Sequence, residues 1–136
     1  MATQRIKSAL LAEPAGEAYS HCLVVDGQIF LSGMIAIGPD GQPVGGADVY
    51  LQAKECIDRC RIMLEAAGAS LADIVKMTVY LTDMSRREGW NRVREESFGA
   101  PRPCSTLIEV KGLARPGMLI ELDVTAVRGA NRAAAS

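Results

Sequence analysis

Apolar residues recur every three or four positions along one segment near the middle of the chain, which is the spacing of one face of an α-helix. The recurring residues are Val49, Ala53, Cys56, Ile57, Cys60, Met63, Leu64 and Ala67. Asp48 stands where a helix N-cap is expected, and Gly68 stands where a left-handed residue commonly ends a helix. The pattern therefore predicts an amphipathic helix of about five turns.

A second helix is predicted over residues 85–98, where the sequence is mostly polar. Trp90 and Val93 are three positions apart and would face inward, while the charged residues around them would face solvent. Pro101 and Pro103 cannot continue a helix, so they mark its end.

Alternating apolar and polar residues predict strands elsewhere in the chain. The predicted strands cover residues 5–11, 20–25, 28–32, 74–81, 105–110 and 119–127. Asp26-Gly27 separates two of them and is typical of a tight hairpin turn. Ser70 and Asp73 have the spacing of a capping box for a single turn before the fourth strand. The Gly- and Pro-rich segment 38–46 is a predicted loop.

This order of elements predicts an α+β fold, with a single mixed sheet and two helices packed on one of its faces. No internal repeat and no linker interrupts it. We therefore expect one domain over residues 1–128, followed by a frayed tail over 129–136.

The predicted sheet face without helices carries both polar and apolar side chains. Glu121 and Asp123 share it with Leu119 in the last strand, and we place Tyr80 and Leu107 on the same face. Such a face is too apolar to be wholly solvated and too polar to be an internal core. It fits a wet subunit interface, so we predict a closed homo-oligomer.

The composition excludes several classes of function. The 136 residues carry a formal net charge of −1, so the totals show no basic nucleic-acid footprint. Aromatic residues make up only 4%, too few for a platform that stacks single-stranded bases. We find no leader-like apolar stretch at the start and no run of ~20 apolar residues that could span a bilayer. We therefore expect a cytoplasmic protein, with neither a membrane nor a nucleic acid as its partner.

The four cysteines, Cys22, Cys56, Cys60 and Cys104, are expected to be reduced thiols in that compartment. Cys56 and Cys60 lie four residues apart on the apolar stripe, which favours core packing. A zinc site needs closely paired Cys or His ligands twice over, and His21 is the only histidine, so we expect no metal. Cys104 is a weak candidate nucleophile because its activation needs a nearby base.

Glu121 is the acid of most interest, because a carboxylate on a partly covered sheet face can have a raised pKa and act as general acid or base. The alternative is a half-exposed strand glutamate with no chemical role. Ser32-Gly33 ends a strand, where it either offers a hydroxyl and a close backbone approach or simply turns into a loop. Arg102, between two prolines, is either a rigid anion clamp or a surface charge.

Several blocks of the sequence form an ordered set that extends from about residue 15 to residue 127. They are Gly16-Glu-Ala-Tyr19-Ser, Ile29-Phe-Leu-Ser-Gly33, Ala66-Ala-Gly68-Ala-Ser-Leu-Ala-Asp-Ile-Val-Lys76-Met-Thr-Val-Tyr-Leu-Thr-Asp-Met84, Asn91, Ile108-Glu-Val110 and Leu119-Ile-Glu121-Leu-Asp. In these blocks and their order the chain resembles the RidA family, also called YjgF or L-PSP proteins.

The resemblance implies a chorismate-mutase-like α+β fold that assembles as a homotrimer, with ligand clefts between the subunits. It also implies hydrolysis of reactive enamines or imines to a carbonyl compound and ammonia, without a metal or organic cofactor. By the same resemblance, Glu121 is the general acid and base, and Tyr19, Ser32 and Asn91 line the same cleft.

One position departs from the family pattern. The resemblance implies an arginine that clamps the substrate carboxylate just before the penultimate strand, and Ser105 occupies that position here. Arg102 or an arginine of a neighbouring subunit is an alternative anchor, while Ser105 beside Cys104 would suit a more neutral ligand. Losing a charge-assisted bidentate contact costs about 1.5–3 kcal/mol, which is about ten- to a hundred-fold in affinity for a carboxylate.

Three functions stay open on these residues. The first is an enamine or imine deaminase with altered substrate anchoring, and the second is a non-catalytic trimer that binds a small metabolite or regulates a partner. The third is an endoribonuclease or translation inhibitor, which the missing basic stripe and the scarcity of aromatics count against.

Overall fold

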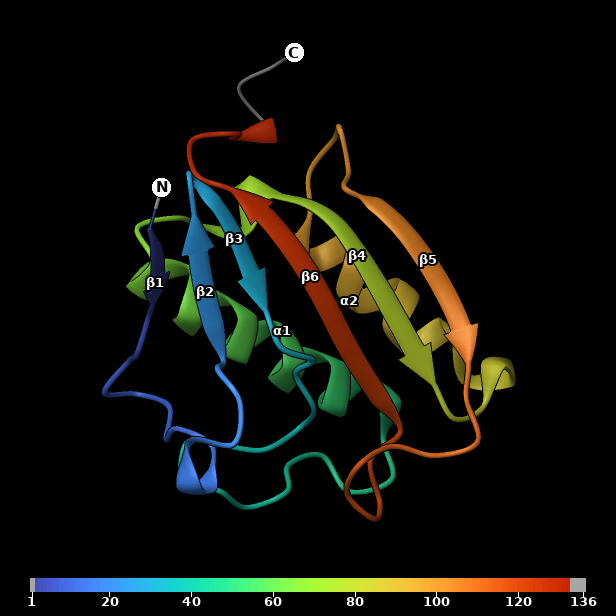
Figure 1. Cartoon of the computed structure of the whole chain (residues 1–136). Helices are drawn as coiled ribbons and strands as arrows, with labels where there is room; N and C mark the ends of the chain where they lie inside the picture. The colour runs from blue at the N-terminus through green and yellow to red at the C-terminus, as the bar shows by residue number, and fades with distance from the viewer. Residues whose placement is uncertain (1, 133–136) are drawn as a thin grey trace.

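The computed structural model describes residues 2–132, which form one six-stranded sheet with two helices behind it (Figure 1). The strands are β1 (Thr3–Arg5), β2 (Cys22–Val25), β3 (Gln28–Leu31), β4 (Ile74–Leu81), β5 (Cys104–Glu109) and β6 (Ile120–Val127). Their order across the sheet is β1-β2-β3-β6-β4-β5, and only β4 and β5 pair in parallel. The predicted mixed sheet with helices on a single face is confirmed.

Helix α1 (Val49–Ala66) confirms the helix that the apolar repeat predicted. The Asp48 side chain accepts a hydrogen bond from the backbone N–H of Leu51 at 3.1 Å, which satisfies one of the free donors in the first turn. Gly68 follows the helix with a φ of +77°, a left-handed conformation that glycine adopts without a steric penalty.

Helix α2 (Glu88–Ser97) is shorter than the predicted helix over 85–98, because a separate 3₁₀ turn, η3 (Met84–Arg86), precedes it. The Asp83 side chain accepts from the backbone N–H of Ser85 at 3.0 Å, and the Glu109 carboxylate accepts from the N–H of Met84 at 2.7 Å. The second contact comes from the end of β5. A tertiary contact thus helps to hold the short turn.

The predicted hairpin is confirmed in β2 and β3. Asp26 and Gly27 both have positive φ, at 52° and 80°, as the tight turn between twisted strands requires. The capping box of Ser70 and Asp73 is also present, in the 3₁₀ turn η2 (Leu71–Asp73) immediately before β4.

The prediction of a first strand over 5–11 is wrong, since β1 covers only Thr3–Arg5. The backbone N–H of Ile6 still donates to the carbonyl of Cys22 at 3.0 Å. After Ile6 the chain leaves the sheet, and Ser8 and Leu11 form only an isolated bridge with each other. The Arg5 side chain ties the following loop to the strand end. It donates to the Glu13 carboxylate at 2.7 Å and to the backbone carbonyl of Tyr19 at 3.0 Å.

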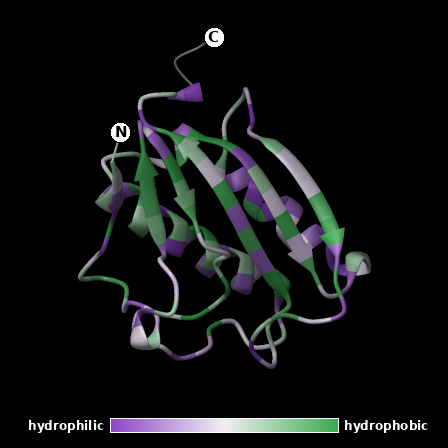
Figure 2. Ribbon diagram, in the orientation of Figure 1, coloured by the Kyte–Doolittle hydropathy of each residue, from purple (hydrophilic) through white to green (hydrophobic). Residues whose placement is uncertain are grey.

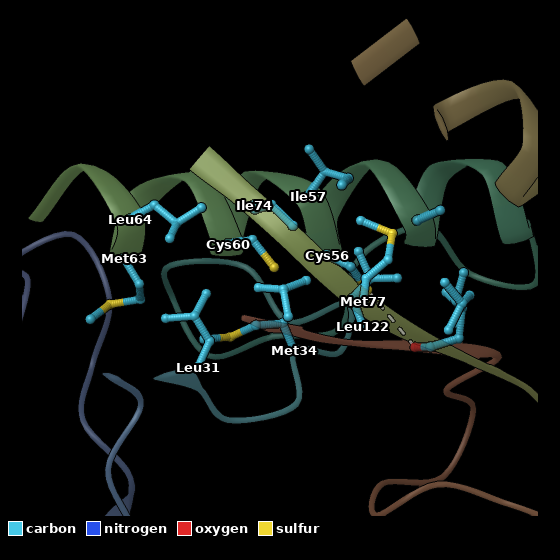
Figure 3. Close-up of a cluster of buried hydrophobic side chains, with 14 of the residues drawn as sticks. Leu31, Met34, Cys56, Ile57, Cys60, Met63, Leu64, Ile74, Met77 and Leu122 are labelled. Atoms are coloured by element: carbon cyan, nitrogen blue, oxygen red, sulfur yellow. Dashed lines mark hydrogen bonds between the residues drawn. The ribbon is translucent and has the colours of Figure 1, made fainter. Parts of the chain in front are cut away.

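The hydrophobic core lies between the sheet and α1. Residues Ile120, Leu122, Val124 and Ala126 of β6 are at most 1% exposed, and the strand alternates between apolar and polar residues along its length (Figure 2). Cys56 and Cys60 project from α1 into this core beside Met34 and Met77 (Figure 3). Burial raises the pKa of the Cys60 thiol to about 12, so both the packing and the protonation state are those of inert core cysteines.

The face of the sheet away from the helices is the outer face. In β6 and β4 the prediction is confirmed, because Glu121 pairs with Tyr80 on this face. For β5 the prediction is wrong. Leu107 pairs with the buried Val79 and lies on the helix side, while Ile108 pairs with Tyr80 on the outer face. The alternation predicted for β5 is correct, but which of its sides faces the helices depends on its register against β4, which tertiary structure sets.

The end of the described chain is held against the rest of the domain. The Arg132 guanidinium donates to the backbone carbonyls of Ile74 at 2.6 Å and Leu71 at 3.0 Å. The backbone N–H of Asn131 donates to the Asp73 carboxylate at 2.8 Å. The remainder of the predicted frayed tail, residues 133–136, lies outside the described residues.

None of the helices within residues 2–132 is both long and apolar enough to cross a membrane. No three His, Cys, Asp or Glu side chains in this part of the chain gather as a group that could hold a metal ion.

Candidate functional site

A cavity of about 390 Å³ opens where β3 ends and the following loop crosses beside β6. The chain joins this loop to β6 through Met34, which exchanges two backbone hydrogen bonds with Leu122 at 2.8 and 3.0 Å. The lining residues that carry chemistry are Tyr19, His21, Ser32, Arg59, Arg115 and Glu121. Three of the residues predicted from the sequence, Tyr19, Ser32 and Glu121, therefore meet in one place.

The Glu121 carboxyl lies directly over Gly33. A Cβ atom at position 33 would stand 2.7 Å from Cδ of Glu121 and 3.1 Å from its Cγ, closer than side-chain atoms normally approach. Only glycine leaves this space free, so Gly33 allows the carboxyl to lie there.

The pKa of Glu121 is raised above its ordinary value, first by burial and second by the neighbouring carboxylate of Asp123. Both effects disfavour the charged form. A larger share of Glu121 is thus protonated near neutral pH than for a glutamate in water, which suits a residue that donates a proton to a ligand.

The Ser32 hydroxyl is fixed in place, because it donates to the backbone carbonyl of Ser20 at 2.6 Å. Its proton is committed to that bond, so its oxygen is available to the cavity as an acceptor. The backbone N–H of Ser32 also donates to the carbonyl of His21 at 2.9 Å, which ties the end of β3 to the segment before β2.

His21 is 5% exposed and forms one wall of the cavity. Its Nε2 lies 2.9 Å from the backbone carbonyl of Ala12, and a carbonyl only accepts, so Nε2 carries the proton. Nδ1 is buried without a partner in residues 2–132. The Tyr19 ring packs edge-on against the imidazole, with the two ring centroids 5.9 Å apart.

The other four predicted site residues do not line this cavity. Asn91 is half-buried on α2 and donates to the Glu88 carboxylate at 3.3 Å. Arg102 is paired with Glu95 at 2.6 Å, at a site where both side chains are exposed. Within one chain, neither side chain reaches Glu121.

Cys104 and Ser105 are both exposed and lie on opposite faces of the edge strand β5. Ser105 pairs with the buried Met77, which places its side chain on the helix side, opposite to Glu121. Cys104 pairs with Lys76 on the outer face, two strands away from β6. A ligand at Glu121 therefore meets neither side chain from the same chain.

Arg59, Arg115 and the place of His21 at this cavity were not predicted from the sequence. Arg59 carried a usable signal, because it follows Cys56 by three residues and precedes Met63 by four. A charged residue at that spacing stands on the apolar stripe of the helix instead of its solvated face. Arg115 belongs to a loop and carried no such signal.

A sequence comparison decides the family. The model of one protein family, described as Endoribonuclease L-PSP, matches residues 10–128. The chain belongs to the L-PSP family. The same family is also called RidA or YjgF, so the relationship that the sequence blocks indicated is confirmed.

Individual L-PSP relatives cover almost the whole chain. A RutC family protein of Pyrococcus abyssi is 36% identical over 128 residues, which is 94% of this chain and 99% of the relative. The human 2-iminobutanoate/2-iminopropanoate deaminase is 32% identical over 127 residues, 93% of this chain and 91% of that protein. The crystal structure of RidA from an Antarctic Psychrobacter superposes with a TM-score of 0.83 at 27% identity, covering 91% of this chain and 98% of that one.

Proposed function

We propose that this L-PSP protein hydrolyses a small, reactive enamine or imine to a carbonyl compound and ammonia. The observation that carries the proposal is the Glu121 carboxyl, held over Gly33 in a cavity and shifted by burial toward its protonated form. The similarity to a human protein named 2-iminobutanoate/2-iminopropanoate deaminase supports this choice of reaction.

The chemistry asks for one group that both gives and takes a proton. Water adds to the carbon of the C=N bond while the Glu121 carboxyl donates its proton to the nitrogen. The carboxylate so formed takes a proton from the added water and passes it to the nitrogen. The C–N bond then breaks to release ammonia, while the hydroxyl gives its remaining proton to the Glu121 carboxylate, which leaves the carbonyl compound and restores the carboxyl. An enamine enters the same sequence after Glu121 protonates its carbon. Each step uses only water and a carboxyl group of suitable pKa.

The proposed working unit is a homotrimer with the ligand cleft between subunits. The outer face is not covered within one chain, and it exposes Phe30, Ile108 and Val127 by 41%, 40% and 37%. Burying this face against other copies would remove apolar surface from water. In this proposal the β5 edge and α2 of a neighbouring copy, and not its outer face, bring Asn91, Arg102, Cys104 and Ser105 to the cleft. Light scattering should give about three times the chain mass of 14.5 kDa, and a mass near one chain would rule the trimer out.

A second candidate function is a non-catalytic trimer that binds a small metabolite. It is favoured by Ser105, which is uncharged at the position where the family pattern has a carboxylate-clamping arginine. A cleft without a carboxylate clamp from β5 would hydrolyse 2-iminobutanoate only weakly unless another group anchors it. An endoribonuclease role, as the family description says, has less support here because the net charge is −1 and aromatics make up 4% of the chain.

The test is a coupled assay in which an amino-acid oxidase or threonine dehydratase generates 2-iminopropanoate or 2-iminobutanoate. Glu121→Gln should abolish any hydrolysis while leaving the oligomer intact. Asp123→Asn is the matched control, since it changes the next outer-face carboxylate of the same strand. It should keep the activity but shift the pH profile to lower pH, because it removes a charge that raises the pKa of Glu121.

Unchanged turnover in Glu121→Gln would return this residue to a structural role. Replacing Ser105 by Arg should raise the activity toward 2-iminobutanoate if the neighbouring copy completes the cleft. No rise would mean that position 105 does not face the substrate.

A further inference from the structure

The Arg59 side chain is a buried cation that forms no ion pair within the described residues. It projects from the middle of α1, and only 9% of the residue is exposed. Its Nη1 donates to the backbone carbonyl of Ile37 at 2.9 Å, the single hydrogen bond that the guanidinium makes within residues 2–132. Its Nε is buried and has no partner there. None of the ion pairs in this part of the chain includes Arg59.

Such an arrangement is unfavourable by itself. A guanidinium has five N–H donors, and each one that is taken from water without a partner costs free energy. Burial lowers the pKa of Arg59, and Glu55, one turn earlier in α1, offsets this only in part. The hydrogen bond to the Ile37 carbonyl uses one donor, at Nη1. A structural role in holding this loop therefore does not account for the buried Nε–H, which has no partner within residues 2–132.

The surroundings of Arg59 indicate what the missing partner is. Arg59 lines the same cavity as Glu121, but the two side chains form no ion pair with each other. Arg115 also lines this cavity, and its Nη1 lies 3.5 Å from the backbone carbonyl of Gly41. The cavity thus combines a largely buried guanidinium, a second guanidinium and one carboxyl that burial pushes toward neutrality. This combination attracts an anion.

We infer that Arg59 is the anion anchor of the Glu121 cavity and binds the carboxylate of a small 2-imino or 2-oxo acid. A planar guanidinium can hold both carboxylate oxygens through parallel N–H donors, which a point charge cannot do. The choice of acid rests on the proposed deaminase function. The anchor itself differs from a clamp at position 105, because it comes from α1 of the same chain that supplies Glu121.

The experiment measures binding of 2-oxobutanoate, the stable oxo counterpart of 2-iminobutanoate, by NMR titration of the full-length protein. Its uncharged analogue is 2-butanone. Arg59→Met should weaken 2-oxobutanoate binding by about ten- to a hundred-fold and leave 2-butanone binding unchanged. Arg59→Lys should fall between wild type and Arg59→Met, because it keeps the charge but loses the planar fork.

Arg61→Met is the matched control. Arg61 lies two residues along the same helix, pairs with Asp58 at the surface and does not line the cavity, so this variant should bind both compounds like the wild type. Equal affinity of Arg59→Met and wild type for 2-oxobutanoate would overturn the inference. An equal loss for both compounds in a folded variant would also overturn it, since Arg59 would then shape the cavity without recognising the carboxylate.

A measurement on the wild type covers the case in which the Arg59 variants do not fold. In protein labelled at arginine, the Nε–H signal of Arg59 should shift as 2-oxobutanoate is added and stay unchanged with 2-butanone. No shift, or no binding of 2-oxobutanoate by the wild type, would overturn the anchor. Binding through Arg59 without hydrolysis of any imine would instead contradict the deaminase proposal and leave the anchor standing. Undiminished hydrolysis of 2-iminobutanoate by Arg59→Met would contradict the anchor and leave the deaminase proposal standing.

Discussion

Replacing Gly33 by Ala should displace the Glu121 carboxyl while changing the free energy of unfolding only slightly. The new Cβ would lie 2.7 Å from Cδ of Glu121, whereas ordinary contacts begin at 3.4 Å, so the carboxyl must move by about 0.7 Å or more. The atoms in the way belong to the far end of a flexible side chain. We therefore expect a stability cost of only about 0.5–1.5 kcal/mol, the range for an off-rotamer side chain.

The effect of Gly33→Ala on catalysis should be much larger. A displacement of about 1 Å at a reacting group can cost about a hundred-fold in rate, which corresponds to about 2.7 kcal/mol in the activation free energy. The coupled imine assay measures the rate, and urea denaturation measures the free energy of unfolding.

Gly112→Ala is the matched control for this experiment. A Cβ at position 112 would meet no atom within 4 Å, so the rate should not change. The stability should change only through the smaller backbone freedom of alanine in the unfolded chain. A wild-type rate in Gly33→Ala would refute the reasoning, because the carboxyl would then act equally well after displacement. A loss of more than about 3 kcal/mol of stability would refute it differently, by showing that the carboxyl cannot move aside.

Three further predictions concern stability. Asp48→Ala should lower the free energy of unfolding by about 1 kcal/mol, measured in urea, because α1 loses its cap at the N–H of Leu51. Gln52→Leu should cost about 2 kcal/mol in the same measurement, since the amide of this buried residue accepts from the backbone N–H of Leu119 at 2.8 Å; the exposed Gln42→Leu is its control. Glu121→Gln should be more thermally stable than wild type at pH 7. A raised folded-state pKa penalises the ionised form, so this advantage should shrink as the pH falls toward 4.5 and vanish below it. An advantage that is independent of pH would contradict the raised pKa.

The features that the sequence predicted well depend on neighbours along the chain. The α1 stripe, the Asp48 cap and the Asp26-Gly27 turn each involve residues within a few positions of one another. Alternation in β6 likewise placed Glu121 on the face opposite the core, as the register against β4 confirms. Local spacing is enough for such features, because helix and strand periodicity directly set which way a side chain points.

The features that the sequence left undecided depend on contacts between distant segments. The short turn η3 is held partly by Glu109, 25 residues further along the chain from Met84. The side of β5 on which Leu107 and Ser105 lie depends on a parallel register, in which a shift of one residue would reverse both faces. The sequence pattern within residues 105–110 does not determine the register in which this segment pairs with β4.

By itself the sequence determined the fold class, the family, the core stripe of α1 and the identity of Glu121 as the acid to examine. Only the tertiary structure decided what surrounds that acid. It brought Gly33 under the carboxyl and placed Arg59 in the same cavity, while Ser105 went to the opposite side of the sheet. The reason is physical: periodicity specifies the direction of a side chain, whereas burial and neighbours come from long-range packing, and these decide its pKa and its partners.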